Sequence, residues 1–275
     1  SNVAVGKSSL GANTTADSNV AVGYDALALN TTGTGNTAVG RDTLLYNTTG
    51  ASNTAIGKDA LKGVSTGATS SNNVAIGLSS LIAVTTGGTN VAVGNYSMAA
   101  MTTGARNVAV GYAALDAAST TSDNTAIGYD ALTATTSGYS NVAVGKDALK
   151  ANTEGQSGVA VGADAATSNL TGHYVTAIGF EAAKNTNASA NVCVGGLALT
   201  TNTTGAYNTA MGHGALTTNN ANYNTAYGYL AGTDVTTAVQ GVFVGANAGA
   251  NVTTGNNNVF VGYGAGDACT TGTPN

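Results

Sequence analysis

The chain has 275 residues and a formal net charge of -5, and only 8% of its residues are charged, against roughly 25% in ordinary soluble domains. Its eight Lys and Arg residues form no basic stripe, which argues against a nucleic-acid partner. Its apolar runs are only a few residues long, so the sequence predicts no insertion into a membrane.

A five-residue motif fills the chain: Asn, then Val or Thr, then Ala, then Val or Ile, then Gly. It first occurs at residues 2–6 and last at residues 258–262. Most steps between copies are 17 residues, and the step from Gly57 to Gly77 is 20. Such a short fixed period is typical of a solenoid, in which each repeat buries its apolar face against its neighbours. We therefore predict one repeat domain over residues 1–275, an all-β solenoid (β-roll) of sixteen repeats of about 17 residues.

Each motif contains a short predicted strand. Residues 20–22 read Val-Ala-Val, the alternation of a strand, and Gly23 ends it. The fourth motif position is apolar and usually β-branched, with Met211 and Tyr227 as larger exceptions. We expect this position to stack into the core of the roll, giving a core row of Val5, Val22, Val39, Ile56, Ile76, Val93, Val110, Ile127, Val144, Val161, Ile178 and Val194.

The third motif position points to the opposite face of the strand and is Ala in most copies. A solvated strand face is usually polar, so a row of Ala suggests that another chain covers it. The predicted subunit interface is Ala4, Ala21, Ala38, Ala55, Ala75, Ala92, Ala109, Ala126, Ala143, Cys193, Phe243 and Phe260.

A turn follows each strand. In the turn Tyr24-Asp25-Ala26-Leu27 and its copies, we expect Leu to fill a corner of the core and Asp to pair with neighbouring cations such as Arg41, Lys58 or Lys146. The three extra residues of the long repeat are predicted to lie in a loop near residues 65–72.

The last repeats change in two positions at once. Gly249 and Gly266 replace the corner Leu, while Phe243 and Phe260 replace the motif Ala. We expect one change of volume to offset the other.

No catalytic constellation is recognisable. The histidines His173 and His213 lie far apart, no Cys/His cluster has zinc spacing, and no Ser, His and acid are brought together by the repeat. We expect no enzymatic activity, no cofactor and no bound metal. Exposed aromatics in the turns could contact glycans: Tyr24, Tyr112, Tyr129, Tyr229 and Tyr263.

The motif resembles the head repeats of trimeric autotransporter adhesins, and the stretch from Asn258 to Gly266 resembles repeats of phage tail-fibre proteins. The resemblance implies a left-handed β-roll in a parallel homotrimeric fibre, located outside the cell, on a cell surface or on a virion. It also implies a structural or adhesive role toward a surface glycan or protein receptor.

Two other functions stay open at this stage. A filament subunit could polymerise end to end through its rungs. An ice-binding solenoid would present a flat lattice of Thr, which this sequence fits less well because Val interrupts Thr at the strand position.

Overall fold

The computed structural model describes residues 1–272, which contain strands and turns but no helix. The all-β class is therefore confirmed for this part of the chain. Two compact units are present, Ser1–Tyr139 and Ser140–Asn275. The single domain over residues 1–275 stays a prediction.

Every copy of the motif forms one three-residue strand, where the sequence placed it. The strands of the first unit are β1 (Val3–Val5), β2 (Val20–Val22), β3 (Thr37–Val39), β4 (Thr54–Ile56), β5 (Val74–Ile76), β6 (Val91–Val93), β7 (Val108–Val110) and β8 (Thr125–Ile127). Those of the second unit are β9 (Val142–Val144), β10 (Val159–Val161), β11 (Thr176–Ile178), β12 (Val192–Val194), β13 (Thr209–Met211), β14 (Thr225–Tyr227), β15 (Val242–Val244) and β16 (Val259–Val261).

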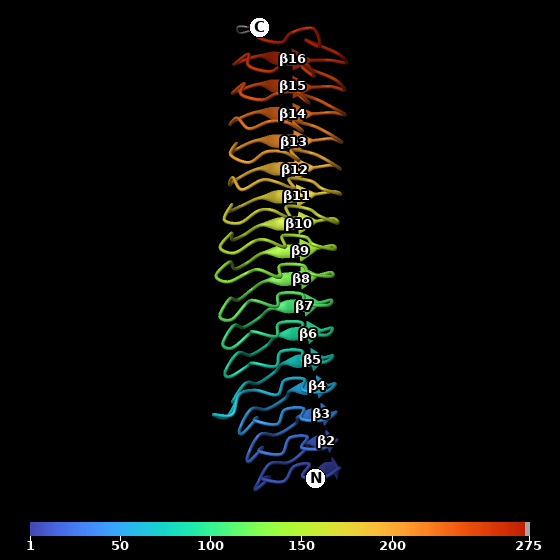
Figure 1. Cartoon of the computed structure of the whole chain (residues 1–275), viewed down its shortest axis with the longest axis vertical. Coiled ribbons are helices and arrows are strands. Elements are labelled where there is room, and N and C mark those ends of the chain that lie inside the picture. Colours follow the sequence, from blue (N-terminus) through green and yellow to red (C-terminus); the bar gives the residue numbers. More distant parts are fainter. Residues whose placement is uncertain (273–275) are drawn as a thin grey trace. The chain divides into compact units, whose positions relative to one another are not determined.

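Within each unit, consecutive strands pair in parallel and in register. The middle residue of one strand lies beside the middle residue of the next, as Ala92 does beside Ala109 and Ala160 beside Ala177. Figure 1 shows the strands of each unit stacked in chain order, with the remainder of each repeat returning behind them. This arrangement is a parallel β-solenoid, so the predicted solenoid is confirmed within both units.

The turns that follow β1 to β15 use left-handed backbone at residues other than glycine. In the second repeat, Asp25 has a φ of 53° and Leu27 a φ of 51°. Asp tolerates this conformation, but for Leu it costs about 1–2 kcal/mol. Leu27 is fully buried, which contributes about 1.5–3 kcal/mol and offsets that cost. The predicted role of the Leu row in filling the core is confirmed.

The predicted assignment of the two strand faces is wrong. The middle residues of the strands are buried inside their own unit: Ala21, Ala38, Ala55, Ala75, Ala92, Ala109, Ala126, Ala143, Cys193 and Phe243 are all 0% exposed. The β-branched residues on either side of them are partly or largely exposed. The Ala row is therefore core and cannot be a subunit interface, and the row containing Val5, Val110 and Ile127 lies at the surface. Ala4 and Phe260 belong to the same inward row but lie in the terminal rungs, where they are less covered.

The small cross-section of the rung explains this reversal. Side chains of the Leu row are fully buried at Leu44, Leu81 and Leu115, in the same core as the Ala row. Close packing then leaves space only for a small side chain on the strand, which is Ala in most repeats and Cys193 in one. The Ala face is covered, as its composition required, but by the corner of the same chain.

The second unit shows the compensation between these two rows directly. An ideal Cβ placed on Gly249 would lie 2.3 Å from Cδ1 of Phe243, and one placed on Gly266 would lie 2.6 Å from Cδ1 of Phe260. The phenyl rings therefore occupy the volume that Leu side chains fill in other repeats. The predicted offset of the two volume changes is confirmed.

A ladder of buried asparagines completes the core, and we did not predict it. At Asn107, the backbone N–H donates to Oδ1 of Asn90 at 2.9 Å, and Nδ2 donates to the carbonyl of Thr121 at 2.9 Å. The Oδ1 atom of Asn107 accepts the N–H of Asn124 at 3.0 Å. Each asparagine thus satisfies backbone groups of its own and the next rung, which explains why the motif begins with Asn.

The long repeat also matches its prediction. Asn47 forms an isolated parallel bridge with Ala68, and Gly63 and Gly67 adopt left-handed backbone between the strands. Figure 1 shows this segment projecting from the first unit near β4. The extra residues are therefore absorbed in a surface loop, and the pairing of β4 with β5 is undisturbed.

The ladder is interrupted at Gly158, which offers a test of its energetics. Gly158 still donates its N–H to Oδ1 of Asn141 at 2.9 Å, and a Cβ there would meet no atom closer than 3.2 Å. In Gly158→Asn, the new amide can reach the carbonyl of Gly172, as Asn141 reaches Gly155. We expect urea denaturation to show a free energy of unfolding about 1 kcal/mol higher, from the added hydrogen bonds and the less flexible unfolded chain.

The matched control is Gly241→Asn, at the same motif position. There a Cβ would lie 2.5 Å from Cζ of Phe243, because the phenyl ring fills the place of the asparagine. This variant should be less stable than the native chain. If both substitutions destabilise equally, the ladder is not the reason for Asn at this position.

Candidate interaction surface

The second and fourth motif residues form the surface that we call the outer strand face. It presents two rows of Val, Thr and Ile on each unit, one on either side of the buried Ala row. Val110 is 36% exposed and Ile127 is 39% exposed, whereas Ala109 between the rows is fully buried. The other large side chains of this face that are exposed are Val3, Val5, Val39, Ile56, Ile178, Val192, Tyr227, Val259 and Val261. Apolar side chains are therefore repeated at the spacing of the strands.

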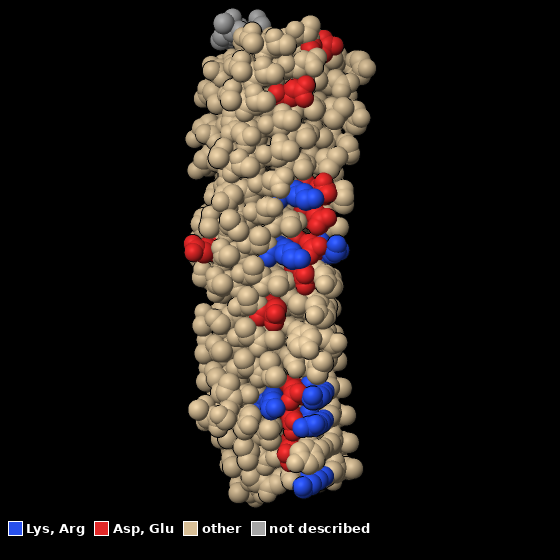
Figure 2. Space-filling view, in the orientation of Figure 1, with Lys and Arg blue, Asp and Glu red and all other residues tan. Residues whose placement is uncertain are grey.

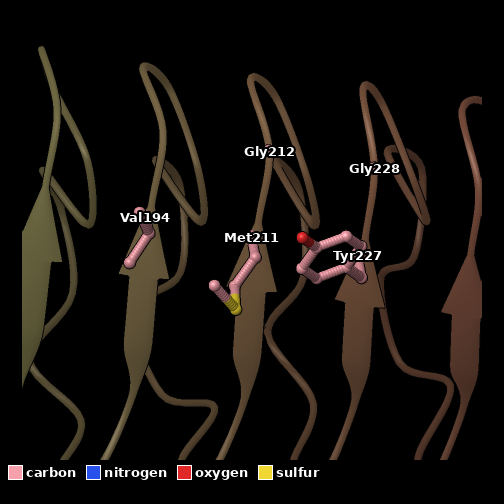
Figure 3. Close-up of a pocket in the computed structure, with 5 residues that line it drawn as sticks. All are labelled: Val194, Met211, Gly212, Tyr227 and Gly228. Carbon is pink, nitrogen blue, oxygen red and sulfur yellow. The ribbon is translucent and has the colours of Figure 1, made fainter.

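The outer strand face of the second unit contains an open depression of about 300 Å³. Val194, Met211 and Tyr227 line it from successive strands, together with Gly212 and Gly228. Figure 3 shows the three side chains on the same side of β12, β13 and β14. Met211 and Tyr227 are the large exceptions noted in the sequence, and they produce the relief on an otherwise regular face.

The predicted glycan contacts are all exposed, from 45% at Tyr24 to 85% at Tyr263. They directly follow the motif glycine and so border the outer strand face. Several of their rings already have partners: Tyr112 and Tyr129 stack with centroids 5.3 Å apart, and Tyr229 stacks on His213 at 5.8 Å. Because a stacked partner covers one ring face, the hydroxyls and ring edges of Tyr112, Tyr129 and Tyr229 are more available to a sugar than those faces.

Sequence reasoning missed a second group of aromatics, which precedes the motif asparagine. Tyr207 and Tyr223 stack with centroids 5.2 Å apart and an interplanar angle of 6°, and both are more than half exposed. Each has a φ near 60°, a conformation that costs a bulky residue about 1–2 kcal/mol. The signal in the sequence that could have revealed this pair is the spacing of the two tyrosines, which is one repeat.

The Asp row of the turns pairs with cations, as predicted. Arg41 binds Asp42 at 3.2 Å, and Lys146 binds Asp147 at 3.2 Å. Lys62 binds Asp59 at 2.9 Å, and that hydrogen bond raises the pKa of Lys62. Figure 2 shows the resulting columns of blue and red side chains. In the Asp row, Asp42, Asp59 and Asp147 are therefore engaged in ion pairs.

Other candidate chemistry is sparse in the described part of the chain. No group of three or more His, Cys, Asp or Glu within residues 1–272 could hold a metal ion. Cys193 and Cys269 are both free thiols, and burial raises the pKa of Cys193. Residues 1–272 contain no helix that is long and apolar enough to cross a membrane.

No protein-family model, curated protein or solved structure matches the chain. What the fold defines is a class, the parallel β-solenoid repeat proteins with one short strand in each repeat. The likeness to adhesin heads and tail fibres therefore stays an expectation.

Proposed function

We propose that the chain is a structural and adhesive fibre segment that assembles as a homotrimer through its outer strand face. The observation that carries this proposal is the regular apolar surface of that face. Contiguous apolar patches of this kind are uncommon on monomers and mark interaction sites. A second copy with the same strand spacing would match the rows of Val, Thr and Ile repeat by repeat.

Adhesion follows from the same periodicity. Weak contacts repeated along a fibre, and again on three chains, bind a surface by multivalency, without any single strong site. The exposed tyrosines beside the outer strand face are the first candidates for contact with a surface glycan or protein receptor. Such a fibre belongs outside the cell, on a cell surface or on a virion.

The assembly is tested by substitution on the outer strand face. In Ile127→Glu, a charge would be buried wherever a second chain covers the face, which costs several kcal/mol. We expect mass measurement in solution to give a trimer for the native chain and a folded monomer for the variant. Thr103→Glu, at an exposed loop position, is the control and should leave the trimer intact.

Two results would contradict the proposal: a native chain that is monomeric at high concentration, or an Ile127→Glu variant that stays trimeric. Filaments that lengthen with concentration would favour the end-to-end polymer instead. Ala109→Glu is unsuitable as an interface variant, because Ala109 is fully buried and its substitution should unfold the unit.

An ice-binding role is the second candidate, and one observation favours it. Thr37 and Thr54 occupy adjacent positions on the outer strand face, so their hydroxyl and methyl groups are presented side by side on neighbouring rungs. Thermal hysteresis above the buffer background would support this function. If thermal hysteresis is absent and the chain is a trimer in solution, the fibre segment remains as the proposed function.

A further inference from the structure

Three cations lie in one row along the edge of the first unit. Lys7, Arg41 and Lys58 each directly follow the glycine that ends a strand, so they occupy equivalent positions on rungs β1, β3 and β4. Tyr24 holds the same position on the rung between Lys7 and Arg41. Figure 2 shows blue side chains in a column along one edge of this unit, beside a red column. We call these four residues the cationic row.

Tyr24 fixes the geometry of this row. Nζ of Lys7 lies 5.5 Å from the centroid of its ring, and Cζ of Arg41 lies 5.8 Å from the same centroid. Both distances fall within the range of a cation–π contact. Tyr24 and Arg41 also line an open depression of about 420 Å³. The ring is thus occupied by cations, which makes the depression better suited to an anion than to a neutral sugar.

The cations of this row retain capacity for an external anion. Arg41 binds Asp42 through Nε, and its side chain is 63% exposed, so its terminal amino groups can meet the two oxygens of a carboxylate or sulfate. Lys58 is 3.8 Å from Asp59, while Lys62 binds that carboxylate more closely, at 2.9 Å. Lys7 forms no ion pair within the described residues.

We propose that the cationic row binds a linear acidic polysaccharide, carboxylated or sulfated, that runs along the stack of strands β1–β4. This deepens the adhesive part of the proposed function and rests on it. Neighbouring rungs lie about 4.8 Å apart, so a chain with regularly spaced anionic groups can meet several rungs at once. The row is one residue wide, which suits a linear ligand better than a membrane surface, and three cations are few for a nucleic-acid backbone.

The experiment measures binding by titration calorimetry to two probes, a heparin-derived oligosaccharide and an oligogalacturonate, with neutral dextran as the comparison. We expect at least one acidic probe to bind and dextran not to bind. Arg41→Gln with Lys58→Gln should weaken binding about tenfold and reduce its salt dependence, because two charge contacts are lost. Lys146→Gln with Lys184→Gln removes the same charge from the second unit and should change affinity less than about twofold.

Several outcomes would overturn this inference. They are failure of both acidic probes to bind, equal binding of dextran, or unchanged affinity in the Arg41/Lys58 variant. A thermal unfolding midpoint unchanged from the native chain establishes that each variant is folded. Mass measurement of the native chain alongside the titration separates the two proposals, because a native chain that is monomeric and still binds an acidic probe refutes the trimer and keeps the cationic row.

Discussion

Gly111→Ala is expected to leave the first unit unable to fold, or to destabilise it by about 4 kcal/mol or more. Gly111 ends β7 with a φ of 144°, a conformation that L side chains rarely adopt. A Cβ there would lie 2.2 Å from the carbonyl oxygen of Gly128 on the next rung. Because that oxygen belongs to the backbone of the stack, no side-chain rearrangement can relieve the contact. Circular dichroism during urea or thermal unfolding measures the loss.

Gly35→Ala is the matched control for this prediction. Gly35 also has a positive φ, 68°, but the nearest atom to its ideal Cβ is Oγ of Ser52 at 3.8 Å. The cost should therefore be only that of the left-handed backbone, about 1 kcal/mol. If the two variants lost the same stability, the close stacking of the motif glycines would not be the cause of their recurrence.

The second large effect is expected at the asparagine ladder. Asn107→Ala removes the acceptor of the Asn124 N–H and the donor to the Thr121 carbonyl, and all three residues lie in the interior of the first unit. Each buried polar group left without a partner costs about 1–3 kcal/mol. We expect a total loss of about 3–5 kcal/mol in the free energy of unfolding, measured by urea denaturation.

Asn95→Ala provides the comparison, since Asn95 is exposed and makes one side-chain hydrogen bond, accepted from the N–H of Leu78. Its substitution should cost less than about 1 kcal/mol. A loss at Asn107 as small as that at Asn95 would contradict a structural role for the ladder.

Most of the fold was accessible from the sequence because the repeat constrains every rung in the same way. A period of 17 residues with one β-branched, Ala, β-branched segment per copy allows only parallel strands in register, and the structure has them at the predicted positions. The loop of the long repeat, the corner Leu, and the offset of Gly249 and Gly266 by Phe243 and Phe260 were predicted for the same reason.

The choice between the two faces of the strand was not accessible from periodicity alone. Alternation places Ala109 opposite Val108 and Val110, but it does not state which side is inside. A signal existed: Phe243 appears in the repeat that loses its corner Leu to Gly249, which indicates that both positions share one core. Because Val is more hydrophobic than Ala, we predicted that the Val face of the strand is buried. That prediction was wrong because the volume left beside the corner Leu suits the smaller Ala side chain.

Which residues form the candidate surface depends on which face of the strand is buried. The exposed positions of Tyr24, Tyr112, Tyr129, Tyr229 and Tyr263 were predicted, but the partners of their rings were not. Stacking of Tyr112 on Tyr129, or of Lys7 and Arg41 on Tyr24, depends on the spacing between rungs and on the direction of each turn.

By itself, the sequence determined the period, the strands, the parallel register and the corner of the core, since each of these follows from which residue types recur at which interval. Only the tertiary structure decided which face of the strand is buried, because that depends on the space left between strand and corner once Leu and Asn side chains are inside. This space admits the methyl group of Ala and excludes Val and Ile. The apolar face left exposed is thus the β-branched one.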